Sequence, residues 1–120
     1  MKITGFSLVD LNGEAVGIGV LGLLLYDGGT VCDDFFSANS ADAICRKMGY
    51  FGQTSYTSGR NWSIQSCLHI ALDNVACSSE NWSSCSFALS HDCDHGEDIF
   101  LQCGPGWYTF GKPNFMFKRL

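Results

Sequence analysis

The chain has 120 residues, a length that predicts one domain with a modest core and excludes a large two-lobed enzyme. Hydrophobic residues make up 46% of the sequence and charged residues 16%, which is typical of a compact domain and not of a disordered tail. The net charge of −5 and the scattered lysines and arginines argue against binding to nucleic acid, which needs clustered positive charge. We expect an acidic surface, which attracts cations.

Two strands are expected early in the chain. Residues 4–9 and 17–26 are rich in Ile, Val, Leu and aromatic residues, and turn-forming residues separate the two segments. Residues 17–22 match the letters GxGxxG, but a strand and a turn follow instead of a helix, so we do not expect nucleotide binding. The longest apolar run, residues 15–25, is far shorter than the ~20 residues that cross a bilayer. No leader peptide precedes it, and we expect that a leader has been removed or that Met1 is not native.

One helix is expected over residues 37–49. Ser37 or Asn39 can cap its start, and apolar residues recur at helical spacing after them. Two basic residues fall in the last turn, and Gly49 ends the helix. Cys45 lies on the apolar face, where it suits a structural bridge.

The rest of the chain predicts a long polar loop, two further strands and an aromatic tail. Residues 50–68 read as the loop, residues 69–77 and 98–103 as the strands, and residues 78–85 as a capped turn or short helix. The last segment, residues 104–120, carries five aromatic residues. Because large exposed apolar patches are unusual on monomers, we expect this segment to pack on the domain or on a partner.

The cysteine content indicates an oxidising compartment. Seven cysteines in a chain of this length are typical of secreted domains, where bridges supplement a small core. No CxxC pair occurs, which argues against a zinc ribbon or a thioredoxin-like site. Two Asn-Trp-Ser sequons predict glycosylation at Asn61 and Asn81.

Six short motifs occur along the chain: GTVCDD (29–34), DAICRKMGY (42–50), IALDNVAC (70–77), SSC (83–85), HDCDHGED (91–98) and LQC (101–103). Their order, and nearly their spacing, resemble those of a scavenger receptor cysteine-rich (SRCR) domain. The chain resembles this family over roughly residues 7–103, and we divide it into an SRCR-like domain, residues 1–103, and the C-terminal extension, residues 104–120. The resemblance implies a small α+β fold in which a curved antiparallel β-sheet cradles one α-helix between long loops. Asp27-Gly28 and Phe35-Phe36 depart from the usual residues and mark a divergent member.

The resemblance also implies a pairing of six cysteines, the pattern of the family's first group. The implied bridges are Cys32 to Cys93, Cys45 to Cys103, and Cys77 to Cys85. Cys67 is left without a partner. We expect it to be a buried free thiol, and the alternative is an exposed thiol that links two chains.

The segment His91–Asp98 holds two histidines, a cysteine and four carboxylates. Three interpretations of this composition are possible. His91 and His95 have the spacing of the HExxH zinc-protease motif, but Asp92 stands where glutamate is needed and a glycine interrupts the helix. Nucleophilic catalysis would require Cys67 to meet a histidine, and its neighbour His69 on the same face of a strand is more often structural. The third reading is an acidic loop beside a structural cysteine, with or without a bound cation.

The implied bridge between Cys32 and Cys93 favours a calcium site. Because a disulfide holds its Cα atoms about 5.5 Å apart, Asp33 and Asp34 would approach Glu97, and the three positions match the family's metal-binding acids. Crowded carboxylates repel one another unless a hard cation lies between them. A second family site would match Asp73 and Asp92, but its third acid falls at Ser37 in this chain. The alternative is an acidic surface solvated by water.

These observations predict an extracellular recognition or adhesion module without enzymatic activity. It would bind a protein, a polyanion or polysaccharide, or a microbial surface, assisted by Ca²⁺ and less well by Mg²⁺. Such a role fits cell adhesion and innate immunity, without membrane insertion or nucleic-acid binding. The alternative function is a structural subunit of an extracellular assembly, docked through the aromatic extension or linked through Cys67.

Overall fold

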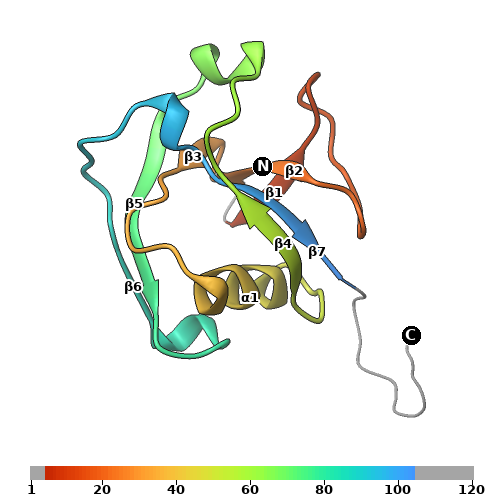
Figure 1. The fold of residues 1–120 in the computed structure, drawn as a ribbon, viewed down its shortest axis with the longest axis vertical. Coiled ribbons are helices and arrows are strands. Elements are labelled where there is room, and N and C mark those ends of the chain that lie inside the picture. Colours follow the sequence, from red (N-terminus) through yellow and green to blue (C-terminus); the bar gives the residue numbers. More distant parts are fainter. Residues whose placement is uncertain (1–4, 105–120) are drawn as a thin grey trace.

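The computed structural model describes residues 5–104, which form one α-helix and a sheet of seven strands (Figure 1). The strands are β1 (Phe6–Val9), β2 (Gly22–Tyr26), β3 (Gly29–Val31), β4 (Gln53–Thr57), β5 (Ile70–Cys77), β6 (Cys85–Ala88) and β7 (Phe100–Cys103). The helix is α1 (Ala38–Lys47), and three short 3₁₀ helices are η1 (Ser63–Cys67), η2 (Trp82–Ser84) and η3 (His95–Glu97). The extension from residue 105 onward, and with it the predicted packing of that segment, lies outside the described residues.

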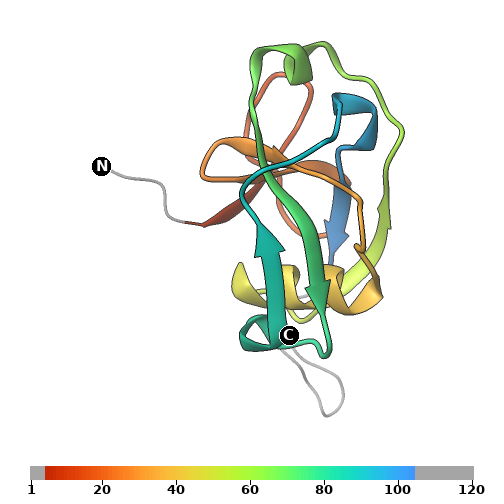
Figure 2. The same ribbon diagram turned by 90° about the vertical axis from the view of Figure 1, so that its left-hand side faces the viewer.

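The strands run in the order β4-β7-β2-β3-β5-β6, and β1 also pairs with β2. The sheet curls, with β4 and β7 on one side and the long β5–β6 ribbon on the other (Figures 1 and 2). The resemblance implies a curved antiparallel sheet, and five of the strand pairs are antiparallel as expected, but β3 pairs with β5 in parallel. This pair is parallel because α1, β4 and η1 intervene, and a connection of that length can carry the chain back to the same end of the sheet.

The single helix is confirmed, and it closes one end of the curled sheet. It contacts β4, β5 and η2, and it lies across the end of the β5–β6 ribbon (Figure 2). Ser37 occupies the N-cap position, and Gly49 takes a φ of +98°, a conformation that glycine adopts without strain. The helix buries Ala41, Ile44 and Cys45 completely. Its apolar face is therefore the one that the spacing predicted.

The predicted loop over residues 50–68 is wrong, because that segment contains β4 and η1. Strand β4 is mostly exposed and polar, so its sequence lacks the alternation that predicts a strand, and its conformation comes from pairing with β7. Strands β3 and β6 were also missed. Both are short, with 3 and 4 residues, and each depends on β5 as its neighbour.

The structure contains three disulfides, two of which join distant parts of the chain, and they are the pairs that the resemblance implies. Their sequence separations are 61 residues for Cys32–Cys93, 58 for Cys45–Cys103 and 8 for Cys77–Cys85. Cys67 is free, but the prediction that it is buried is wrong, since its side chain is exposed. It ends η1 at the surface and does not lie on a strand beside His69. No helix in residues 5–104 has the length and apolar character needed to cross a membrane.

Candidate functional site

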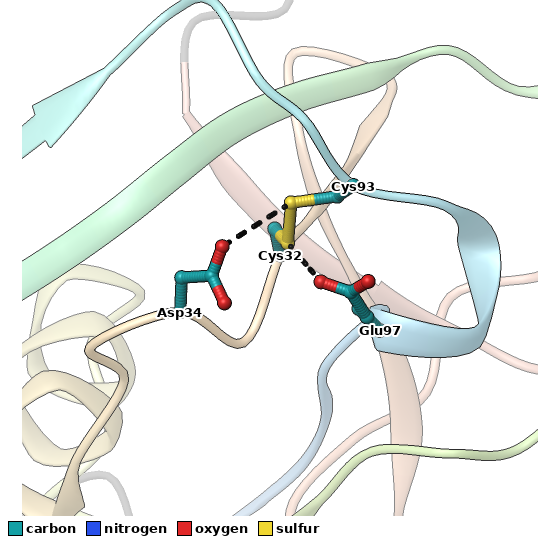
Figure 3. A group of neighbouring side chains, drawn as sticks. All are labelled: Cys32, Asp34, Cys93 and Glu97. Carbon is teal, nitrogen blue, oxygen red and sulfur yellow. Dashed lines mark hydrogen bonds between the residues drawn. A yellow bond between two sulfur atoms is a disulfide. The ribbon is translucent and has the colours of Figure 1, made fainter.

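The Cys32–Cys93 disulfide places two carboxylates on either side of its sulfur atoms (Figure 3). Asp34 follows β3 and lies with Oδ2 3.7 Å from Cys93 Sγ, while Glu97 on η3 lies with Oε1 3.4 Å from Cys32 Sγ. These are contacts and not proton-sharing bonds, because a disulfide sulfur carries no proton. One oxygen from each acid and the two sulfurs lie within 4.8 Å of one another. The predicted approach of Asp34 to Glu97 is therefore present in the structure.

Asp34 also belongs to a second group of acids. One of its oxygens lies within 4.8 Å of oxygens of Asp73 and Asp92. Asp73 comes from β5 and is only 3% exposed, whereas Asp92 is exposed on the loop before Cys93. In the family's second site the third acid would fall at Ser37, which here occupies the N-cap position of α1, and Asp34 completes the group instead. A single carboxylate is thus common to both acidic groups.

Asp33 does not join either group, although the resemblance placed it among the metal-binding acids. Its Oδ2 accepts a hydrogen bond of 2.8 Å from the Ser58 hydroxyl. The Phe36 N–H donates to the Asp33 carbonyl and closes a turn. Within this turn the side chains of Asp33 and Asp34 have different partners, Ser58 for Asp33 and the disulfide for Asp34. Asp33 therefore contributes charge near the site, while its carboxylate is bonded elsewhere.

An open pocket of about 680 Å³ lies over the second group of acids. Its lining includes Asp34, Asp73 and Asp92 together with Phe35 and His91. Phe35 has a φ of +61° and a side chain that is 74% exposed. A bulky residue rarely takes this left-handed conformation, and here the turn directs an aromatic ring to the surface beside the acids.

Burial and neighbouring negative charges raise the pKa values of Asp34 and Glu97. The pKa of Asp34 is raised by partial burial and then by the negative charges of Asp73, Asp92 and Asp33. The pKa of Glu97 is raised by partial burial and then by the charges of Asp34, Asp33 and Asp94. The surrounding negative charges therefore disfavour ionisation of Asp34 and Glu97, and a bound cation would relieve this repulsion.

The donor set fits a hard cation better than zinc. Both cysteines are oxidised, so the sulfurs are not thiolate ligands, and the remaining donors are carboxylate oxygens. His91 and His95 do not converge: His91 Nδ1 accepts from the Cys93 N–H, and both ring nitrogens of His95 face acceptors elsewhere. Oxygen-only donors suit calcium, and magnesium to a lesser degree because it demands a tighter octahedron.

A buried polar cluster behind Glu97 was missed by the sequence analysis. Its members are Gln65 on η1, His95 on η3 and Asp98. Three hydrogen bonds connect the η1 segment to the η3 segment, and a fourth joins His95 to Asp98 within the η3 segment. Asp98 and Gln65 are 0% and 2% exposed. The only signal in the sequence was a carboxylate three residues after a histidine, and nothing there points to a glutamine some 30 positions earlier.

The other predicted residues lie on the surface. Asn61 and Asn81, the two sequon asparagines, are exposed just before η1 and η2. Their glycosylation remains a prediction.

A curled mixed sheet, one helix, three disulfides and an acidic surface site together define a small disulfide-bonded module of the extracellular recognition class. The chain belongs to the scavenger receptor cysteine-rich domain family, whose model matches residues 11–104. SRCR domains are extracellular or ectodomain modules that bind ligands or proteins and are not themselves enzymes.

Solved SRCR domains share this fold. The SRCR domain of mouse MARCO, in its dimeric form, is similar with a TM-score of 0.52 and 28% identity over 75% of this chain and 94% of that one. The third SRCR domain of murine neurotrypsin gives a TM-score of 0.52 and 26% identity over 82% and 96%. Among curated proteins, lysyl oxidase homolog 2 of Bos taurus is 37% identical over 90 residues, and that of Homo sapiens is 36% identical over 90. These matches span 65% of this chain but only 11% of the relatives' length.

Proposed function

We propose that this SRCR domain recognises a protein or polysaccharide ligand, including ligands on microbial surfaces, with the help of calcium bound at the Asp34 carboxylate. The observation that supports this most directly is the position of Asp34, which faces Glu97 on one side and Asp73 and Asp92 on the other. A cation at this point would neutralise the charges that raise the pKa values of Asp34 and Glu97.

The domain would supply only part of the calcium shell. Calcium takes six to eight oxygen ligands, and the described carboxylates of either group can fill only some of these positions. The remaining positions would be open to water or to oxygen atoms of a ligand. We therefore expect weak calcium affinity, with a Kd of about 10⁻⁴–10⁻³ M, as in other extracellular modules.

The open pocket beside Asp34 supports a ligand that reaches the cation from outside. It is exposed to solvent and is lined by Phe35 and His91 as well as by the acids. A ligand with an anionic or hydroxyl group could complete the calcium shell while its apolar part contacts the Phe35 ring. Both protein side chains and sugars carry such groups.

Calorimetry with calcium tests the proposal. Titration of the wild type with millimolar calcium should give a binding heat, and Asp34→Ala should abolish it while the fold remains intact. The fold should persist because removing one crowded carboxylate relieves repulsion in the calcium-free protein. Magnesium should compete poorly with calcium in the same titration.

Glu14→Ala is the matched control for this experiment. Glu14 is exposed, its loss removes the same charge, and it belongs to neither acidic group. The control should bind calcium like the wild type. Equal heats in the wild type and Asp34→Ala, or no heat in either, would contradict the proposal.

A further inference from the structure

The Gln65 side-chain amide joins η1 to η3 beneath the surface. It is 2% exposed, and its Nε2 donates to the His95 carbonyl at 2.8 Å and to Asp98 Oδ2 at 2.7 Å. Its Oε1 accepts a hydrogen bond from the Trp62 N–H. Both amide protons and the amide oxygen of Gln65 are therefore used within the fold.

The Asp98 carboxylate depends on this amide for its orientation. Asp98 is fully buried, and its Oδ2 accepts from Gln65 and from His95 Nδ1, which lies at 2.8 Å. Its Oδ1 has no hydrogen-bond partner among the residues that the structure describes. His95 Nε2 in turn lies 2.9 Å from the Leu68 carbonyl, directly after η1. The bonds between η1 and η3 thus all converge on His95 and Asp98.

Glu97 lies between these two anchored residues. Element η3 has only three residues, so few hydrogen bonds of its own fix its orientation, and the Glu97 N–H donates to the Asp94 carbonyl at 3.0 Å. The backbone bridge between Cys32 and Asp98 holds one end of this segment, and the side-chain bonds of His95 and Asp98 hold it against η1. Gln65 bonds to both of these residues and is therefore placed to influence the direction of the Glu97 side chain.

We propose that Gln65 is a positioning residue that sets the cation affinity of the Asp34–Glu97 pair by holding η3. This inference rests on the proposed calcium function, but it assigns a role to a buried residue that cannot contact the cation itself. Residues behind metal ligands typically change metal affinity by 10–100-fold when they are replaced.

Replacement of Gln65 by Met tests the inference, because Met has a similar length and no donors. We expect Gln65→Met to weaken calcium binding about 10-fold in calorimetry. Gln102→Met is the matched control, since Gln102 on β7 makes one exposed side-chain hydrogen bond to Ser55 and should leave calcium binding unchanged. Gln65→Glu, which keeps the acceptor for Trp62 but loses both donors, should also weaken binding if the Met variant does not fold.

A double-mutant cycle separates positioning from general destabilisation. Because Gln65 is proposed to act through Glu97, Gln65→Met should have no further effect on calcium affinity in a Glu97→Gln background. Losses that add in the double mutant, or an unchanged affinity in Gln65→Met, would overturn the inference.

Hydrogen exchange in the calcium-free protein tests the same role without the cation. Gln65→Met should speed exchange of the Glu97 and Asp98 amides, and Gln102→Met should not. If the wild type binds no calcium, the proposed function fails, whereas exchange still decides whether Gln65 holds η3. Unchanged exchange at these two amides would refute the positioning role itself.

Discussion

Asp34 is the residue on which both acidic groups depend. Its carboxylate lies within reach of Glu97 across the disulfide and of Asp73 and Asp92 at the pocket. Because one carboxylate serves both groups, a cation bound by either group would change the charge felt by the other. The two potential cation positions are therefore coupled through a single side chain.

The raised pKa values predict how stability changes with pH when calcium is absent. The folded protein holds its protons on Asp34 and Glu97 to higher pH than the unfolded chain does, so ionisation of these groups destabilises the fold. The destabilisation is complete above the raised pKa values and disappears below the ordinary values of 3.8 and 4.5. At neutral pH without calcium, Asp34→Asn should therefore be more stable than the wild type in urea unfolding.

This difference in stability should narrow as the pH falls through the raised pKa values, because the wild type then loses the same charge by protonation. Millimolar calcium at neutral pH should narrow it as well, by stabilising only the wild type. A difference that stays constant with pH would contradict the charge-crowding explanation.

At the scale of elements, α1 is held to the sheet by a bridge as well as by packing. Cys45 lies on its buried face and is bonded to Cys103 at the end of β7, and both residues are fully buried. A second bridge, Cys77–Cys85, joins the neighbouring strands β5 and β6. The first bridge closes a long loop and the second a short one.

Removal of these two bridges should therefore cost different amounts of stability. With separations of 58 and 8 residues, loop-closure entropy gives about 4 kcal/mol for Cys45–Cys103 and about 2.5 kcal/mol for Cys77–Cys85. Double Ala variants of each pair, compared by denaturant unfolding, should show the larger loss at Cys45–Cys103. The reverse order would contradict the loop-entropy explanation.

The elements that could be predicted are those with a strong local pattern. The helix follows from its apolar spacing and from Gly49, and β5 and β7 follow from their apolar runs. Strand β4 could not be predicted, because its exposed polar residues become a strand only through pairing with β7. Likewise, Asp34 and Glu97 were found through motif order, whereas Gln65 has a role only because η1 packs against η3.

At the scale of the whole molecule, charge is divided unevenly along the chain. All twelve acids precede residue 104, whereas three of the seven bases, Lys112, Lys118 and Arg119, follow it beside the five aromatics of the extension. The predicted docking of this segment is thus consistent with attraction to an acidic domain as well as with apolar contact.

Removal of residues 105–120 tests that docking. If the extension packs on its own domain, the truncated chain should unfold at a lower urea concentration. If it docks on a second copy, sedimentation should show a smaller mass, with or without calcium, as the structural-subunit alternative requires. Unchanged stability together with unchanged mass would count against any docking of the extension.

The position of β7 in the sheet has a consequence for biosynthesis. Among residues 5–104 it is the last strand in the chain order, yet it pairs on one side with β4 and on the other with β2. A growing chain emerges from the ribosome from its N-terminus, so β2, α1 and β4 must wait for β7 before the sheet can close. The bridges of Cys32 and Cys45 also wait, because their partners Cys93 and Cys103 lie next to or within this last strand. Until then the two cysteines have no native partner, so the native bridges of Cys32 and Cys45 can form only after nearly all of the domain has been synthesised, and disulfide exchange would be needed to correct any bridge formed earlier.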